Sequence, residues 1–182
     1  PDKFFPVDTD STRPFTFGWI GKAQQSSNFD SRVVDLKGVG IIREAFDKFK
    51  EVNEGVILDV DLFVYNASEM PLLKHDEVRD TFFANIDCLI CASESEGTPN
   101  TVFEALACGV PVISTSVGNV EDVVVAGVNG YTFDRTVTDL VTYMNKVYNS
   151  QWDKKVISDS VSEFHWSKKA KIWGYSLLGM KS

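Results

Sequence analysis

A short apolar run, followed by a turn, a helix and a second apolar run, is the feature that most constrains this chain. Residues 86–92 have the continuous apolar character of a strand that is buried on both faces, and residues 111–114 form a second such run. Residues 99–108 between them predict a helix that stops at Gly109. Two buried strands joined by a helix indicate a parallel sheet.

The alternation of strands and helices extends over most of the chain. Further strands are predicted at residues 15–21, within 56–65 and in the turn region 127–133, and further helices at 38–52, 76–85, 120–126, 138–148, 152–161 and 167–178. Residues 23–35 are polar and predict a long loop, whereas the proline-containing residues 1–14 predict a lead-in linker. We therefore expect an α/β fold with a doubly wound, mainly parallel sheet, in one domain of residues 15–182.

Charge and hydropathy limit the partners of this domain. The net charge of −8 opposes general attraction to nucleic acid or to an anionic membrane, so any phosphate site has to be local. The apolar runs are far shorter than the roughly 20 residues that span a bilayer, and they indicate no membrane association. These features predict a cytoplasmic domain that binds no nucleic acid.

The three cysteines predict buried thiols in a reducing compartment rather than a metal or redox centre. Cys88 and Cys91 have the spacing of a CxxC pair. They lie, however, in the predicted strand 86–92, where residues three apart face opposite sides of the sheet.

Other candidate ligands of a metal are isolated. Asp59 and Asp61 form an Asp-x-Asp sequence, but alternation along a strand places both on an exposed face, so we expect no metal there. His75 and His165 are single residues in polar surroundings, for which we expect surface or capping roles.

The turn after residues 86–92 predicts an anion site. Ligands of a doubly wound sheet bind beyond the carboxyl ends of the strands, where the next helices begin. Thr98 is predicted to be the N-cap of the helix and Pro99 its first residue. The free backbone amides of Asn100 and Thr101 then face the crevice, with the positive end of the helix behind them.

Glu96 and Glu104 extend this hypothesis to a larger ligand. Glu104 lies about 8 Å along the helix axis from Pro99. With a diphosphate at the helix start, its carboxylate would reach the two adjacent hydroxyls of a ribose, and Glu96 would face the group on the other phosphate. Alternatively both are surface acids that fall eight residues apart by chance. The apolar neighbours of Glu104 nevertheless predict burial, and a buried carboxylate needs partners.

The eighteen residues 96–113, Glu-Gly-Thr-Pro-Asn-Thr-Val-Phe-Glu-Ala-Leu-Ala-Cys-Gly-Val-Pro-Val-Ile, resemble a known motif. It is the Glu, seven residues, Glu motif of the retaining GT-B glycosyltransferases of family four, with the helix and strand that follow it. The resemblance continues in Gly21-Lys22, in Lys37-Gly38 and in residues 164–167, Phe-His-Trp-Ser, so it covers nearly the whole chain. It implies a Rossmann-like donor-binding domain, the C-terminal half of a GT-B fold.

The resemblance also implies a role for each matching residue. The residues implied to bind a nucleotide-diphosphate sugar are Lys22, Gly97, Thr98, Asn100, Thr101 and Glu104, with Glu104 on the ribose. Glu96 would bind the transferred sugar and Lys37 the diphosphate, which makes these two the catalytic candidates. Lys22 stands where the family usually has Arg, a change that keeps the charge but loses a bidentate fork.

The resemblance implies a donor substrate but neither a metal nor a cofactor. The Gly-Asp-Gly that the family usually carries near the base pocket is absent from residues 56–87, so the nucleotide base is not predicted. In GT-B enzymes an N-terminal domain holds the acceptor. We therefore expect such a domain as a partner, on the same chain or another, and little transfer by this domain alone.

Two other functions remain open at this point. One is a non-catalytic module that binds a nucleotide sugar or a partner protein. The other is a GT-B-like sugar-nucleotide epimerase, which would be expected to supply further catalytic acids and histidines than this chain shows.

Overall fold

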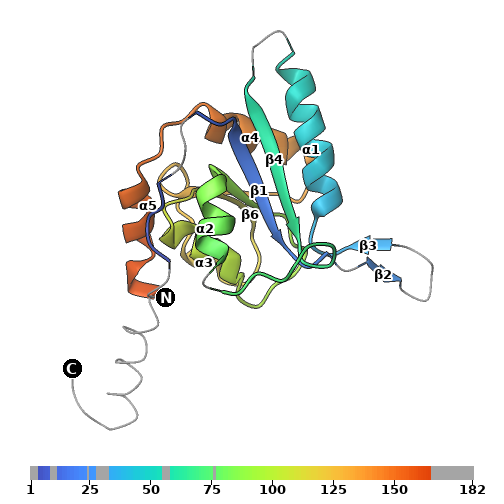
Figure 1. Ribbon diagram of the computed structural model, residues 1–182. Helices are drawn as coiled ribbons and strands as arrows, with labels where there is room; N and C mark the ends of the chain where they lie inside the picture. Colours follow the sequence, from blue (N-terminus) through green and yellow to red (C-terminus); the bar gives the residue numbers. More distant parts are fainter. Residues whose placement is uncertain are drawn as a thin grey trace.

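A five-stranded sheet forms the centre of the computed structural model, which describes residues 4–8, 12–23, 25–27, 33–54, 58–75 and 77–164. The strands are β1 (Phe15–Gly21), β4 (Val60–Asn66), β5 (Cys88–Cys91), β6 (Val112–Thr115) and β7 (Gly130–Phe133), in the order β4-β1-β5-β6-β7 (Figure 1). All neighbouring pairs in this sheet are parallel. The expected α/β fold with a parallel sheet is confirmed.

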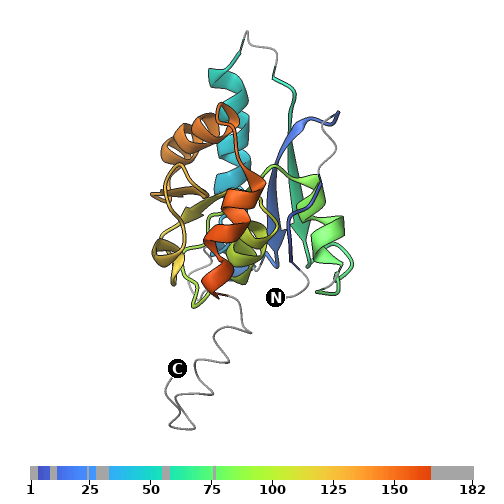
Figure 2. The ribbon, with the colours of Figure 1, turned by 90° about the vertical axis from the view of Figure 1, so that its left-hand side faces the viewer.

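Helices cover both faces of the sheet. α1 (Val39–Val52) and α4 (Val137–Tyr148) pack on one face, and α2 (Val78–Thr81), α3 (Asn100–Ala107) and α5 (Lys154–Ser160) pack on the other. Figure 2 shows the strands between α1 and α4 on one side and α2 on the other. The sheet is doubly wound, because the chain runs from β1 to β4 on one side and from β5 to β6 on the other.

The sequence of β5 is apolar throughout because both faces of the strand are buried. Cys88 and Ile90 pack against α1 and α4, whereas Leu89 and Cys91 pack against the opposite layer. Each of the four is at most 6% exposed. Burial of a side chain such as Ile90 contributes about 1.5–3 kcal/mol. The two thiols are free and face opposite sides of the sheet, as their spacing in a strand predicts.

The segment between β1 and α1 is an exception to the predicted pattern. Residues 23–35 were expected to form a loop, but they contain an antiparallel hairpin of β2 (Gln25–Ser27) and β3 (Val33–Asp35). This prediction was wrong, because a three-residue strand is too short for an alternating pattern to appear. The hairpin lies beside the carboxyl ends of β1 and β4 (Figure 1).

Helix boundaries differ from the prediction where the periodicity is weak. In the region 76–85, α2 is followed by a 3₁₀ turn, η1 (Phe83–Asn85), instead of one continuous helix. In the region 120–126, only the 3₁₀ turn η2 (Val120–Asp122) is helical. A further 3₁₀ turn, η3 (Ser162–Phe164), follows α5, and the predicted helix 167–178 lies outside the described residues.

The described residues 4–8 form neither a helix nor a strand, and they pack against the layer that contains α3 and α5. Phe4 and Val7 are buried in that layer. Val7 donates its amide to Cys108 O at 3.2 Å, and its carbonyl accepts a hydrogen bond from Lys154 Nζ at 2.8 Å. Within the described residues, no helix is long and apolar enough to cross a membrane.

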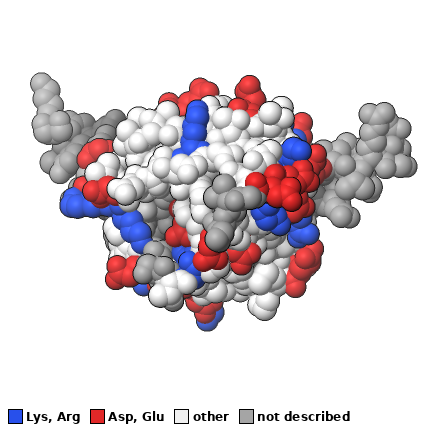
Figure 3. Space-filling view, turned by 90° about the horizontal axis from the view of Figure 1, so that it is seen from above, with Lys and Arg blue, Asp and Glu red and all other residues white. Residues whose placement is uncertain are grey.

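The charges on the face drawn in Figure 3 are mixed in sign. Figure 3 views the molecule from above Figure 1, and blue and red side chains lie interspersed among uncharged ones. Neither sign forms a continuous surface across the described part of this face.

Candidate functional site

The carboxyl ends of β1 and β5 form the switch point of the sheet, because the chain leaves these neighbouring strands in opposite directions. Ligands of such folds bind in the crevice at this edge. Three of the predicted site residues lie in loops that start here: Lys22 after β1, Lys37 after β3 and Glu96 after β5.

Lys37 and Glu96 form an ion pair in this crevice. Lys37 Nζ donates to Glu96 Oε1, and Ser93 Oγ donates to the same oxygen at 2.9 Å. The side chains of Lys37 and Glu96 are 36% and 22% exposed, so a ligand can reach both. The sequence predicted both residues for the site but not their contact.

Asp35 fixes the conformation of the loop that carries Lys37. Its carboxylate accepts hydrogen bonds from the amides of Gly38, Val39 and Gly40, at 2.9, 3.1 and 2.6 Å. These bonds close the N-terminus of α1, whose amides are therefore occupied. Gly38 has φ 75°, and a Cβ there would lie 2.3 Å from Ala92 O, so only glycine permits this close approach to the end of β5.

The loop that carries Glu96 is held from two sides. The Glu94 amide donates to Leu36 O at 2.9 Å, and Thr115 Oγ1 donates to Ser93 O at 2.7 Å. Gly118, with φ 56°, lies directly against the loop, because a Cβ at this position would be 2.3 Å from Gly97 O. The loop is thus fixed by neighbours from the turn after β3, from β6 and from the loop after β6.

Helix α3 begins next to this loop, and its N-terminus carries no side-chain cap. The prediction of Thr98 as N-cap and Pro99 as first helical residue was wrong by one position. Pro99 is the N-cap, with a non-helical ψ of 83°, and Asn100 is the first helical residue. Thr98 and Asn100 are exposed, as is Gly97. In contrast to α1, α3 therefore leaves its first amides available to an anion.

Glu104 lies one turn further along α3, and its side chain is 17% exposed. Its Oε1 is 3.0 Å from His75 Nε2, and the rings of His75 and Phe4 pack in a T-shaped arrangement with a centroid distance of 5.0 Å. Burial raises the pKa of Glu104, and the hydrogen bond from His75 opposes this effect. The expected burial is confirmed, but His75 was not predicted for the site. No local signal could have found it, since His75 is 29 residues away on a loop.

Lys22 lies at the same edge, directly after β1, and is exposed. The end of β1 is fixed to the end of β4, because the Ala67 amide donates to Gly21 O at 2.8 Å and the Ala23 amide donates to Asn66 Oδ1 at 3.1 Å. Lys22 is thereby held between two short backbone attachments, while its side chain faces solvent.

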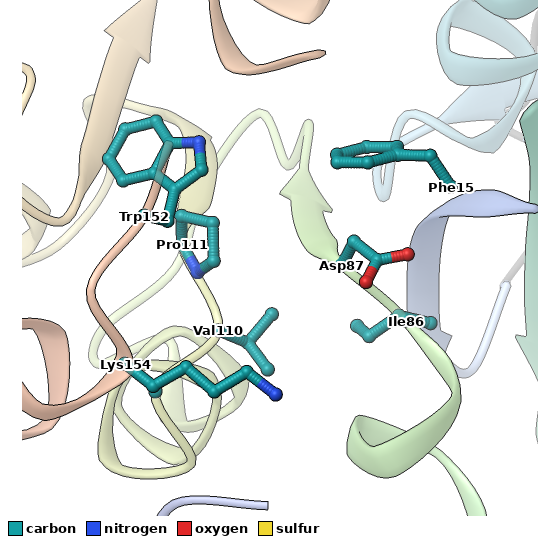
Figure 4. A pocket seen from close by; sticks show the side chains of 8 residues that line it. Phe15, Ile86, Asp87, Val110, Pro111, Trp152 and Lys154 are labelled. Atoms are coloured by element: carbon teal, nitrogen blue, oxygen red, sulfur yellow. The ribbon is translucent and has the colours of Figure 1, made fainter. Parts of the chain in front are cut away.

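A separate pocket of about 140 Å³ lies at the opposite edge of the sheet. Figure 4 shows Phe15, Ile86 and Asp87 on one side of it and Val110, Pro111, Trp152 and Lys154 on the other. Its charged groups have partners: Asp87 pairs with Arg13 at 2.6 Å, and Lys154 donates to Val7 O. The pocket is remote from Lys37, Glu96 and Glu104 by its place in the fold.

The Asp59 and Asp61 sequence also lies at this opposite edge, at the start of β4. Asp61 Oδ1 accepts a hydrogen bond from the Leu62 amide at 2.7 Å. Nowhere in the described part of the chain do three His, Cys, Asp or Glu side chains gather in a way that would hold a metal ion.

Solved structures of glycosyltransferases have the same fold. The chain superposes on sucrose-phosphate synthase from Thermosynechococcus elongatus with a TM-score of 0.72 and 16% identity, over 98% of this chain and 50% of that one. For Anabaena HepE in complex with UDP the TM-score is 0.64 with 17% identity, over 92% and 50%. For the C-terminal domain of the group 1 glycosyltransferase LpcC from Francisella tularensis it is 0.59 with 16% identity, over 88% and 95%.

The sequence comparisons give the family. An uncharacterised glycosyltransferase of Methanocaldococcus jannaschii is 30% identical over 164 residues, which cover 84% of this chain and 46% of that protein. The chain thus spans about half the length of this curated relative. The family model described as glycosyl transferases group 1 matches residues 69–163, more than half of the chain and the part that contains β5, α3 and both glutamates. The chain therefore belongs to the group 1 glycosyltransferases.

Proposed function

We propose that this domain binds the nucleotide-diphosphate sugar donor of a retaining glycosyltransferase. The observation that carries the proposal is the arrangement at this edge of the sheet. The Lys37–Glu96 pair lies in the loops next to the uncapped start of α3, and Glu104 lies on α3 itself. Cation, helix amides and two acids suit the chemistry of a diphosphate between two hydroxyl-bearing groups. The solved HepE complex, a fold relative, contains UDP.

In this proposal the diphosphate lies at the start of α3. Lys22 and Lys37 offset its charge from the loops after β1 and β3, and the amides of Asn100 and Thr101 donate to its oxygens. These groups stabilise the leaving diphosphate most strongly when its charge grows in the transition state. Lys37 has three donors, so it can retain Glu96 and still contact a phosphate oxygen. No metal or cofactor is assigned a role.

Glu96 and Glu104 then hold the two ends of the donor. Glu96 accepts hydrogen bonds from hydroxyls of the transferred sugar, and Glu104 accepts from the ribose. The bond between the anomeric carbon and the diphosphate breaks while a bond to the acceptor oxygen forms on the same face of the sugar, which gives retention. The hydroxyl proton of the acceptor passes to the leaving diphosphate oxygen. We assign Glu96 to hydroxyl recognition rather than to covalent attack, because the leaving group is already stabilised.

The acceptor side belongs in this proposal to a second domain. The curated relative and two of the solved structures above are about twice as long as this chain, and the similar LpcC structure is of a C-terminal domain by itself, which supports this proposal. An N-terminal domain on the same or another chain would hold the acceptor and close over the crevice. The domain alone would then bind donor and transfer little sugar.

Calorimetric titration with UDP-, GDP- and ADP-sugars tests the proposal. We expect saturable binding of one nucleotide class, weakened about tenfold or more by Lys37→Met and by Glu104→Gln, since each removes a charge-assisted hydrogen bond. Lys48→Met is the matched control, because Lys48 is exposed on α1 and pairs only with Glu51 among the described residues. Binding by none of the three nucleotide classes at millimolar concentration would contradict the proposal.

A further inference from the structure

Arg135 joins the two loops that carry Lys37 and Glu96. It follows β7, and its Nε donates to Ala92 O at 2.8 Å, while its Nη2 donates to Asp35 O. The two acceptors lie 43 and 100 residues away in the sequence. One guanidinium therefore connects the carboxyl ends of three strands, β3, β5 and β7.

Both acceptor carbonyls stand just before a site residue. Asp35 O lies two residues before Lys37, in the turn that enters α1, and Ala92 O lies four residues before Glu96. We propose that Arg135 is a positioning residue that sets the distance between the Lys37 and Glu96 loops and thereby holds the diphosphate end of the donor site in its binding geometry.

Two further contacts bring the same loops together. The Glu94 amide donates to Leu36 O at 2.9 Å, and Gly38 lies against Ala92 O without room for a Cβ. The backbone bond and the glycine bring the loops into contact, and the guanidinium adds one hydrogen bond to a carbonyl of each loop. A planar fork with fixed donor spacing is suited to this, whereas a lysine offers a single point charge. A partly buried hydrogen bond from a charged donor is also stronger than a neutral one.

This inference rests on the proposed donor site, so its test has one readout that requires a nucleotide and one that does not. The variant is Arg135→Lys, which keeps the charge but replaces the planar fork, whose two nitrogens bind one carbonyl each, with a single flexible ammonium group. The matched control is Arg13→Lys. Arg13 is a partly buried arginine at the opposite edge of the sheet, where it binds Asp87 through two nitrogens and Pro14 O through one of them. Both variants are expected to lower stability.

The first readout is amide hydrogen exchange of the protein alone. In Arg135→Lys, we expect the amides of Gly38, Val39, Gly40 and Glu94 to exchange about tenfold faster, because both loops lose their shared anchor. In Arg13→Lys these four amides should keep their wild-type rates. Unchanged exchange in Arg135→Lys would overturn the inference whether or not a nucleotide binds.

The second readout is affinity for the nucleotide diphosphate whose sugar the wild type binds, measured at equal fractions of folded protein. We expect Arg135→Lys to weaken it about tenfold and Arg13→Lys to leave it unchanged. In double-mutant cycles, Arg135→Lys should be non-additive with Lys37→Met but additive with Glu104→Gln, because Glu104 is held by α3 and His75. The positioning role would be overturned if the wild type binds and Arg135→Lys binds with the same affinity. It would also be overturned if Arg135→Lys is additive with both Lys37→Met and Glu104→Gln. Failure of the wild type to bind would instead refute the donor site itself.

Discussion

His75 Nε2 lies 3.0 Å from Glu104 Oε1, so the acid proposed to bind a ribose is already engaged by a side chain from the loop after β4. The His75 side chain is 60% exposed, whereas that of Glu104 is 17% exposed. The histidine can therefore move toward solvent without disturbing the core, while the glutamate stays in place on α3. In the proposed donor complex, a ribose hydroxyl would either replace His75 at Oε1 or use the second carboxylate oxygen.

The contact with His75 should be measurable as a pKa effect. His75 lowers the pKa of Glu104, against the larger upward effect of burial, so His75→Ala should raise the pKa of Glu104 further. Carbon-13 NMR titration of the glutamate carboxyl groups measures this, with Glu104→Gln used to identify the signal. His75→Gln, which keeps a hydrogen-bond donor, should raise the pKa less than His75→Ala does. An identical Glu104 titration in wild type and His75→Ala would show that the contact is not formed in solution.

Glu104 should also make stability depend on pH. Because burial raises its pKa, the folded protein binds this proton more tightly than the unfolded chain does. Glu104 thus contributes stability that is fully present below the unfolded pKa and is lost as the pH rises through the raised value. Glu104→Gln removes this titration. In urea unfolding, the free energy of unfolding of the variant should therefore rise relative to that of the wild type between about pH 4 and pH 7. A constant difference in unfolding free energy over that range would contradict this prediction.

Gly118 should be intolerant of a side chain. Its φ of 56° disfavours other residues, and a Cβ would lie 2.3 Å from Gly97 O. We expect Gly118→Ala to destabilise the fold by about 1–3 kcal/mol, and to weaken nucleotide binding because the backbone at residues 96 and 97 has to shift.

Gly97→Ala is the control for this prediction. Nothing lies within 4 Å of a Cβ at Gly97, so we expect little change in stability there. Chemical denaturation of both variants gives the comparison. Equal loss of stability in the two would show that the close approach of Gly118 does not constrain the loop.

The thiols of Cys88 and Cys108 should be unreactive in the folded protein. Burial raises the pKa of Cys88 well above its usual value and that of Cys108 to about 12, so almost no thiolate forms at pH 8. Labelling with a thiol-exchange reagent at pH 8, read by peptide mass spectrometry, should modify both residues only after denaturation. Modification faster than global unfolding would show that one of these sites opens locally.

Much of the fold could be predicted because its signals are local. The strand at residues 15–21 has the predicted bounds. The apolar run that contains β5 correctly indicated a strand whose two faces are both buried, and all four residues of β5 are buried. Helix α3 ends near Gly109, whose φ of 76° is the left-handed conformation expected after a helix. The start of α3 was harder to predict, because Thr98 and Pro99 are both acceptable at a helix N-terminus and only the backbone angles identify Pro99 as the N-cap.

The features of the candidate site likewise divide into those that the sequence predicts and those that only the structure shows. The sequence by itself determined the order along the chain of the five strands of the main sheet and of the longer helices, the burial of Glu104, and, through the family resemblance, the presence of Lys37 and Glu96 in one site. Only the tertiary structure decided that Lys37 pairs with Glu96 across 59 residues, that His75 contacts Glu104, and that Arg135 reaches Asp35 across 100. The physical reason is that periodicity and capping record whether a residue is buried and how the backbone turns. Which distant residues meet depends instead on the order of the strands and on the loops that their ends bring together.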